Sequence, residues 1–142
     1  MAQNEFSNHS GYFIQEIARK TNYLLNGLLA PLGITYAQFR VLNCLWKKRI
    51  LLQKEIHEVI EVKPSTLTGL IDLLEAKRLL GRSVSEVDAR ANRIRLTEKG
   101  RELMEPAWKV IEAFENRMTE GIDESGKKGL IIHLKRINGN LE

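Results

Sequence analysis

The chain contains a single cysteine, Cys44, so no disulfide can form within its 142 residues. A lone cysteine is typical of proteins that work in a reducing compartment. No segment approaches the roughly 20 consecutive apolar residues of a membrane-spanning helix. Residues 1–11 lack the basic stretch and apolar core of a secretory signal. We therefore expect a cytoplasmic protein without a membrane segment.

Motifs that carry catalytic or metal chemistry are also missing. The sequence contains no P-loop, no Gly-rich dinucleotide turn and no Cys/His nucleophile pair. Its three histidines, His9, His57 and His133, are far apart and do not have the spacing of metal ligands. We therefore expect neither an enzyme nor a metal or cofactor site.

The composition, with 43% hydrophobic and 28% charged residues, indicates one globular domain with a core of its own. The net charge of +4 is unevenly distributed. Residues 34–100 carry 13 Lys/Arg against 8 Asp/Glu, a net +5, and the rest of the chain carries −1. Positive charge in the middle of the chain suits a segment that meets phosphate, although many basic proteins bind no nucleic acid.

Hydrophobic periodicity predicts a mainly α-helical fold. The expected helices are 10–29, 36–48, 53–59, one that opens at residue 63, 98–119, and one that starts at residue 123 or 125. Thr35 is the expected N-cap of the second helix, and Pro64 takes the N1 position that proline favours in the fourth. Residues 1–8 are polar and expected to be loose. Trp46 and Val59 are expected to face the core.

A small basic β-hairpin is expected after the fourth helix, with strands at 80–85 and 93–96 and a loop between them. Arg93 and Arg95 alternate with apolar residues and therefore share one strand face, where Arg82 on the partner strand is expected to join them. Arg90, near the tip, is suited to insertion into a minor groove, and Asp88 is expected to hold the tip by pairing with an arginine. A small-residue helix followed by a basic hairpin predicts a winged helix-turn-helix that binds duplex DNA.

The residues expected to contact DNA share the start of the fourth helix or the hairpin: Lys63, Ser65, Thr66, Thr68, Gly69, Arg82, Arg90, Arg93 and Arg95. Serine and threonine also favour helix starts for purely structural reasons. None of the helix residues has the bidentate side chain of a strong base reader, which is Arg, Asn or Gln. We therefore expect much phosphate contact, and specificity that comes largely from DNA shape.

The order of these elements, together with Asp88-Ala89-Arg90 and the run 96–100 (Leu-Thr-Glu-Lys-Gly), resembles the MarR family of bacterial transcription regulators. The resemblance covers nearly the whole chain and includes the run 64–68 at the position of the recognition helix. It implies a homodimer whose regions 1–33 and 101–142 form a helical dimerisation region and whose region 34–100 is the DNA-binding winged helix. The chain departs from the family at Arg78, where a glycine is common after the recognition helix.

Dimerisation through the last helix is further indicated by a narrow apolar seam of Leu130, Leu134, Ile137 and Leu141. The resemblance implies a pseudo-palindromic operator, repression of transcription, and release from DNA by a small-molecule effector. An alternative from another class is a winged-helix protein-interaction module without specific DNA binding. Such modules typically lose the basic hairpin.

A small aromatic or anionic effector would suit a pocket lined by His9, Tyr12, Phe13, Tyr36 and Arg40, although each aromatic residue there has packing as an alternative role. Redox sensing is a second possibility. Family members that sense oxidants tend to carry a reactive cysteine near the N-terminus, and this chain has none there. Cys44 lies within the most apolar helix and is expected to be unreactive.

Overall fold

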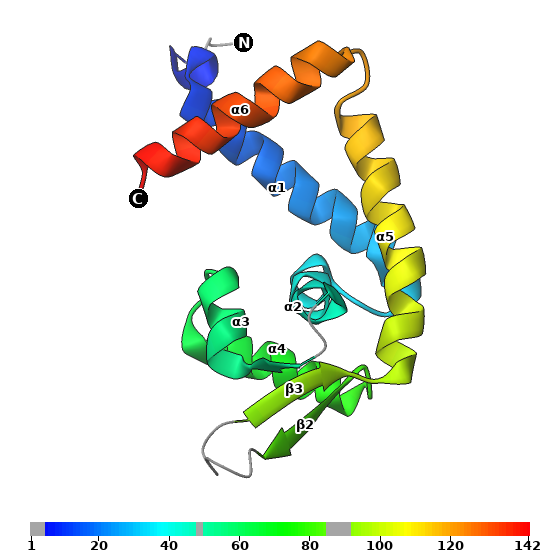
Figure 1. The fold of residues 1–142 in the computed structure, drawn as a ribbon. Coiled ribbons are helices and arrows are strands. Elements are labelled where there is room, and N and C mark those ends of the chain that lie inside the picture. The colour runs from blue at the N-terminus through cyan, green and yellow to red at the C-terminus, as the bar shows by residue number, and fades with distance from the viewer. Residues whose placement is uncertain (1–4, 48–49, 85–91) are drawn as a thin grey trace. The chain divides into compact units, whose positions relative to one another are not determined.

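The computed structural model describes residues 5–47, 50–84 and 92–142, and it shows a mainly helical chain with a small antiparallel sheet (Figure 1). Its elements, in order, are η1 (Glu5–Asn8), α1 (Ser10–Leu29), η2 (Ala30–Leu32), α2 (Tyr36–Lys47), β1 (Leu51–Leu52), α3 (Gln53–Val59), α4 (Pro64–Ala76), β2 (Leu80–Val84), β3 (Asn92–Leu96), α5 (Glu98–Met118) and α6 (Glu124–Asn140). The fold class predicted from the sequence is confirmed. None of the helices in these ranges is long and apolar enough to cross a membrane.

The chain divides into two compact units, Met1–Val110 and Ile111–Glu142. The first unit contains everything from η1 to β3 and the first half of α5. The second contains the end of α5 and α6. The predicted winged region therefore lies in one unit with α1.

The sheet has three strands in the order β1-β3-β2, with β3 in the centre. Leu51 of β1 pairs with Ile94, and Leu80 of β2 pairs with Leu96. The sequence predicted only the hairpin, because a strand of two residues is too short to show alternation. Of the N-terminal residues expected to be loose, Glu5–Asn8 form a turn of 3-10 helix instead, and residues 1–4 lie outside the described residues.

The core of the first unit forms where α2, α4, the sheet and the start of α5 meet. Its fully buried side chains include Val41, Leu42, Leu45, Leu67, Ile71, Leu74, Leu80, Ile94 and Met104. Trp46 and Val59 were expected inside, but they are 38% and 65% exposed. Leu45 takes the inward position at the end of α2, and the buried residues at α3 are Ile56 within the helix and Ile60, its C-cap.

The start of α2 is fixed by a reciprocal capping box. The backbone N–H of Gln38 donates to Thr35 Oγ1 at 3.1 Å, and the N–H of Thr35 donates to Gln38 Oε1, also at 3.1 Å. The prediction of Thr35 as N-cap is confirmed. Gln38 is buried, and its Oε1 also accepts from Lys77 Nζ at 3.1 Å. Lys77 thereby connects the end of α4 to the start of α2.

Candidate nucleic-acid interface

The N-terminus of α4 is an exposed, cationic helix start. Lys63 is its N-cap in extended conformation, and Pro64 follows at the first helical position, as predicted. Ser65 and Thr66 are exposed on the first turn, and no side chain caps this end. Backbone N–H groups of a first helical turn have no partner within the helix and favour an anion such as phosphate.

Thr68 is held in place from two sides. Its hydroxyl donates to the Pro64 carbonyl at 3.0 Å and accepts from Gln53 Nε2, also at 3.0 Å. The second bond ties α4 to the first residue of α3, and sequence reasoning did not single out Gln53. A hydroxyl that already donates within the helix can meet DNA only as an acceptor or through its methyl group.

Gly69 has no structural reason to be glycine within the described residues. It lies on the exposed side of α4, and a Cβ placed on it would meet no atom within 4 Å. Glycine inside a helix costs about 0.5–1 kcal/mol relative to alanine. The described residues therefore give no packing reason for a glycine at this position.

The central strand β3 presents two arginines to solvent. Arg93 and Arg95 are exposed, whereas Ile94 and Leu96 between and after them are 0% and 5% exposed. This alternation is the one predicted from the sequence. Two cations on the outer face of one strand, about 7 Å apart along it, suit neighbouring phosphates of a nucleic-acid backbone.

Arg82 does not join them, and the expectation that it would is wrong. In the observed register Arg82 lies opposite Ile94, and directly opposed residues of paired strands point to the same face of a sheet. Ser83 is the residue that shares the face of Arg93. Arg82 therefore points to the face of the sheet that bears the buried Ile94.

There Arg82 connects the wing, which is the hairpin of β2 and β3, to α4. Its Nη2 donates to Asp72 Oδ1, and its Nε lies 3.6 Å from Glu75 Oε2. The Arg82 side chain is only 23% exposed, and its buried Nε has no hydrogen-bond partner within the described residues. These contacts fix β2 against the helix, while both acids remain largely open to solvent.

Asp88 and Arg90, predicted to shape the tip and to enter a minor groove, lie outside the described residues.

Arg78, directly after the C-cap of α4, occupies a position suited to glycine, as the sequence comparison with the family indicated. Arg78 has φ of 62°, the left-handed conformation, and it follows the C-cap Lys77. The N–H of Leu79 donates to the Leu74 carbonyl at 3.0 Å, and the N–H of Arg78 donates to the Glu75 carbonyl at 2.9 Å. This pair of bonds is the Schellman motif, which usually has glycine at the left-handed position.

We expect Arg78→Gly to raise the free energy of unfolding by about 1 kcal/mol, because it removes the contact between Cβ and carbonyl that penalises the left-handed conformation. Urea denaturation measures the change. Arg78→Ala is the matched control, since it removes the guanidinium but keeps Cβ. A glycine variant no more stable than the alanine variant would contradict the explanation.

The run 96–100 forms a joint between α4 and α5. Thr97 caps α5 by accepting from the Gly100 N–H at 3.1 Å, and its hydroxyl donates to the Arg78 carbonyl at 2.6 Å. The Thr97 N–H donates to the Leu79 carbonyl at 3.1 Å, and Lys99 Nζ donates to the Lys77 carbonyl, also at 3.1 Å. These bonds explain why this run is needed directly after the wing.

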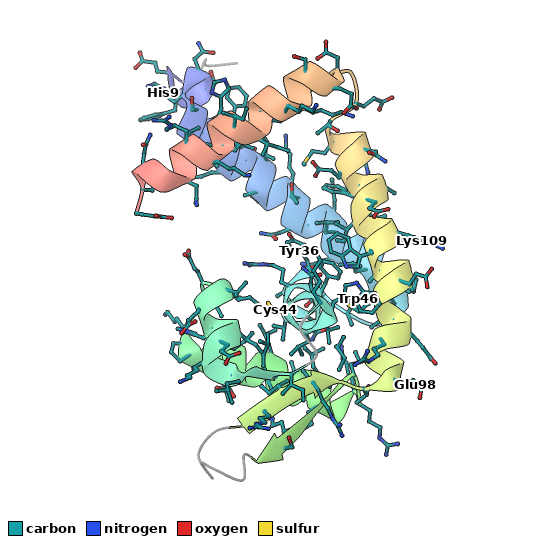
Figure 2. The ribbon with its side chains drawn as sticks, in the orientation of Figure 1. His9, Tyr36, Cys44, Trp46, Glu98 and Lys109 are labelled. Atoms are coloured by element: carbon teal, nitrogen blue, oxygen red, sulfur yellow. The ribbon has the colours of Figure 1, made fainter. Side chains whose placement is uncertain are left out.

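The five residues predicted to line an effector pocket are not brought together in one chain. Tyr36 lies beside Asn26, whose Oδ1 accepts from the Tyr36 N–H at 2.8 Å. Tyr12 precedes Asn26 by 14 residues of the same helix, or about 21 Å. His9 and Phe13 share the far end of α1, and Figure 2 shows His9 well away from Tyr36. Arg40, one turn after Tyr36 on α2, is the only member near it.

A different aromatic cluster forms at the Tyr36 end. The Tyr36 ring stacks on Phe39 with centroids 6.3 Å apart, and Phe39 meets Trp108 of α5 edge-on at 5.4 Å. The buried Trp108 Nε1 has no hydrogen-bond partner within the described residues. Sequence reasoning did not single out Trp108, because its place beside α2 follows from tertiary packing.

Cys44 is half-buried in α2 (Figure 2). Burial raises the pKa of its thiol, and the positive charge of Arg40, one turn earlier, offsets part of the rise. The reactive thiolate is therefore scarcer at neutral pH than it is for a free cysteine.

We expect Cys44 in the folded protein to react with an aromatic disulfide reagent at pH 7 several times more slowly than in urea, and faster as the pH rises toward the raised pKa. Stopped-flow absorbance gives both rates. A folded-state rate equal to that of the unfolded chain would show an activated thiol instead.

Within the described ranges no group of three or more His, Cys, Asp or Glu side chains could hold a metal ion.

Comparisons with known proteins agree on one family. The model described as "MarR family" matches residues 34–91. The organic hydroperoxide resistance transcriptional regulator of Bacillus subtilis (strain 168) is 32% identical over 103 residues, which are 72% of this chain and 70% of that protein. The multiple antibiotic resistance protein MarR of Escherichia coli (strain K12) is 31% identical over 101 residues, 71% of this chain and 70% of that one.

Solved structures extend the similarity to nearly the whole chain. The transcriptional repressor CouR, bound to a 23-mer DNA duplex, superposes with a TM-score of 0.89 at 27% identity, covering 97% of this chain and 98% of that one. A mutant of MarR from E. coli complexed with operator DNA superposes with a TM-score of 0.85 at 26% identity, covering 95% of this chain and 99% of that one. The helix start, the basic strand face and the capped joint described above thus occur in a chain that belongs to the MarR family of winged helix-turn-helix transcriptional regulators.

Proposed function

We propose that the protein binds duplex DNA as a homodimer and represses transcription at a two-fold-symmetric operator. The observation that carries the proposal is the pair Arg93 and Arg95, exposed on the outer face of β3 in the same unit as the uncapped, cationic start of α4. The helix start suits the major groove, and the basic strand suits the adjacent backbone. The relatives bound to DNA duplexes support this assignment.

Lys63, Ser65, Thr66, Thr68 and Gly69 are the proposed contacts of α4, and Arg90, Arg93 and Arg95 those of the wing. Arg82 is the exception. Because its guanidinium already meets Asp72 and Glu75, we assign it the role of holding the wing against α4. Any phosphate contact by Arg82 would compete with these carboxylates.

The uncovered apolar seam of α6 supports the homodimer. Leu130 and Leu134 of α6 and Leu141, which follows the helix as its C-cap, are 39%, 44% and 81% exposed in the single chain. An unpaired row of leucines along one helix is stabilised when a second copy covers it. Two winged regions on one duplex would then read half-sites about one helical turn apart, roughly 10 bp.

The proposed effector is a small aromatic or anionic molecule at the cluster of Tyr36, Arg40 and Trp108. Arg40 would supply a cation, and the Trp108 indole N–H, which lacks an acceptor within the described residues, would supply a donor. Such a ligand releases DNA only if it binds better to the dimer geometry that cannot engage both half-sites. His9, Tyr12 and Phe13 lie about 20 Å from this cluster and belong to it only if a partner subunit supplies them.

Fluorescence anisotropy tests the function directly. The protein is titrated with a labelled duplex from the gene's own upstream region and with a scrambled duplex of equal length, at several salt concentrations. DNA-specific binding predicts a selective affinity that falls steeply with salt, because phosphate contacts release counterions. Weak, equal binding to both duplexes would favour the protein-interaction module instead.

A further inference from the structure

The outward face of α4 carries an exposed leucine that the DNA-contact set does not include. Leu73 is 53% exposed, whereas Leu67, Ile71 and Leu74 of the same helix are at most 1% exposed. Leu73 lies four residues after Gly69 and seven after Thr66, and residues at these spacings share one side of a helix.

Leu73 borders an open space above Gly69. A Cβ placed on Gly69 would meet nothing within 4 Å outside its chain neighbours and the helix backbone, so the Leu73 side chain does not fill this space. Helical side chains lean toward the N-terminus of their helix, and Leu73 therefore extends toward the turn that contains Gly69. We call the surface formed by Thr66, Gly69 and Leu73 the α4 notch, with one hydroxyl-bearing side, one bare backbone and one apolar side.

The α4 notch is chemically suited to a methyl group. Between Pro64 and Ala76 there is no Arg, Lys, Asn or Gln, so the helix has no bidentate reader of guanine or adenine. Thymine is the one base whose edge in the major groove carries a methyl group. A leucine beside a bare glycine gives that methyl group both an apolar contact and room to approach.

We propose that Leu73 and Gly69 form a specificity site that recognises the 5-methyl group of a thymine in each operator half-site. The proposal rests on the proposed function, since it places α4 in the major groove. It differs from the expectation drawn from sequence, in which specificity comes largely from DNA shape. In this proposal the solvent-exposed Leu73 serves base recognition, a role separate from helix stability and from core packing.

The test uses DNA in which only the methyl group is removed. Wild-type protein first selects duplexes from a random-sequence library, and deoxyuridine then replaces thymidine at each position of the selected duplex in turn. Replacing the recognised thymine should weaken binding about fourfold, the ratio for one buried methyl-sized group, and about fifteenfold when both half-sites are changed. Anisotropy at constant salt measures each affinity.

Three variants connect this effect to the α4 notch. Leu73→Ala should bind the thymine and uracil duplexes equally. Gly69→Ala, whose added methyl group fills the notch, should bind the uracil duplex better than the thymine duplex. Val59→Ala, which trims an exposed apolar side chain on α3, should keep the fourfold preference of the wild type. Thermal unfolding of each variant confirms that it is folded.

The outcomes separate this inference from the proposed function. If wild-type protein selects no duplex, both are overturned, and a protein partner becomes the candidate for this face. If it selects a duplex but ignores the methyl groups, or if Leu73→Ala keeps the preference, the notch is not the reader and only this inference falls.

Discussion

Gly100→Ala is expected to lower the free energy of unfolding by about 3 kcal/mol, at the upper end of the cost of overpacking. A Cβ on Gly100 would lie 2.1 Å from the carbonyl oxygen of Leu79 and 3.3 Å from Leu96 Cδ2. The first of these neighbours is backbone and cannot rotate away. It is also held by the N–H of Thr97, so relief requires breaking the joint between α4 and α5.

Thermal or urea denaturation measures the loss, which corresponds to a fall of about 10 °C in Tm for a chain of this size. Gly27→Ala is the matched control, because Gly27 also lies in a helix and a Cβ there meets nothing within 4 Å. This control should be more stable than the wild type by about 0.5–1 kcal/mol. If both substitutions shift stability equally, the close approach at Gly100 has no energetic importance.

Replacing Arg93 and Arg95 together by glutamine is expected to weaken DNA binding about a hundredfold at low salt while leaving the fold intact. The two side chains are exposed on the outer face of β3, so their removal disturbs no buried contact. In a dimer the change removes four phosphate contacts. The slope of log K against log salt should therefore become less steep by about 3.6, at about 0.9 per contact.

Salt-dependent anisotropy with the wild-type operator duplex gives both quantities. A variant with Lys20→Gln and Lys109→Gln removes the same number of exposed cations from α1 and α5. It should change the slope far less, which separates local phosphate contact from net charge. An unchanged slope in the Arg93/Arg95 variant would remove the wing from the interface.

The parts of the fold that could be predicted are those fixed by local chemistry. The capping box of Thr35 and Gln38 and the N1 proline at residue 64 satisfy the unpaired N–H groups of one helix end, and each can be read within four residues. The start of α6, which the sequence left open between residues 123 and 125, is set by Asp123, whose side chain accepts from the Gly126 N–H at 2.7 Å.

The parts that could not be predicted depend on register and on tertiary packing. A strand pattern does not state which residue it faces, and a shift of one residue moves Arg82 from one face of the sheet to the other. Its partners Asp72 and Glu75 come from a different element. The effector set divides for a similar reason, because His9, Tyr12 and Phe13 lie at the start of α1 whereas Tyr36 and Arg40 lie on α2, beside the other end of α1.

The hydrogen bonds at the C-terminal end of α4 attach that helix to the first turn of α5, so a rotation of α5 about this attachment point would move the far end of α4. Thr97 and Lys99 donate hydrogen bonds to the carbonyls of residues 77–79. Lys77 Nζ in turn donates to the Gly33 carbonyl at 2.7 Å. From this attachment point α4 extends 13 residues, about 20 Å. A rotation of about 5° at α5 would displace the N-terminus of α4 by about 2 Å, enough to break a hydrogen bond to a base edge. In the proposed regulation, a slight turn of α5 on effector binding would therefore be enough to move the start of α4 out of register with the operator.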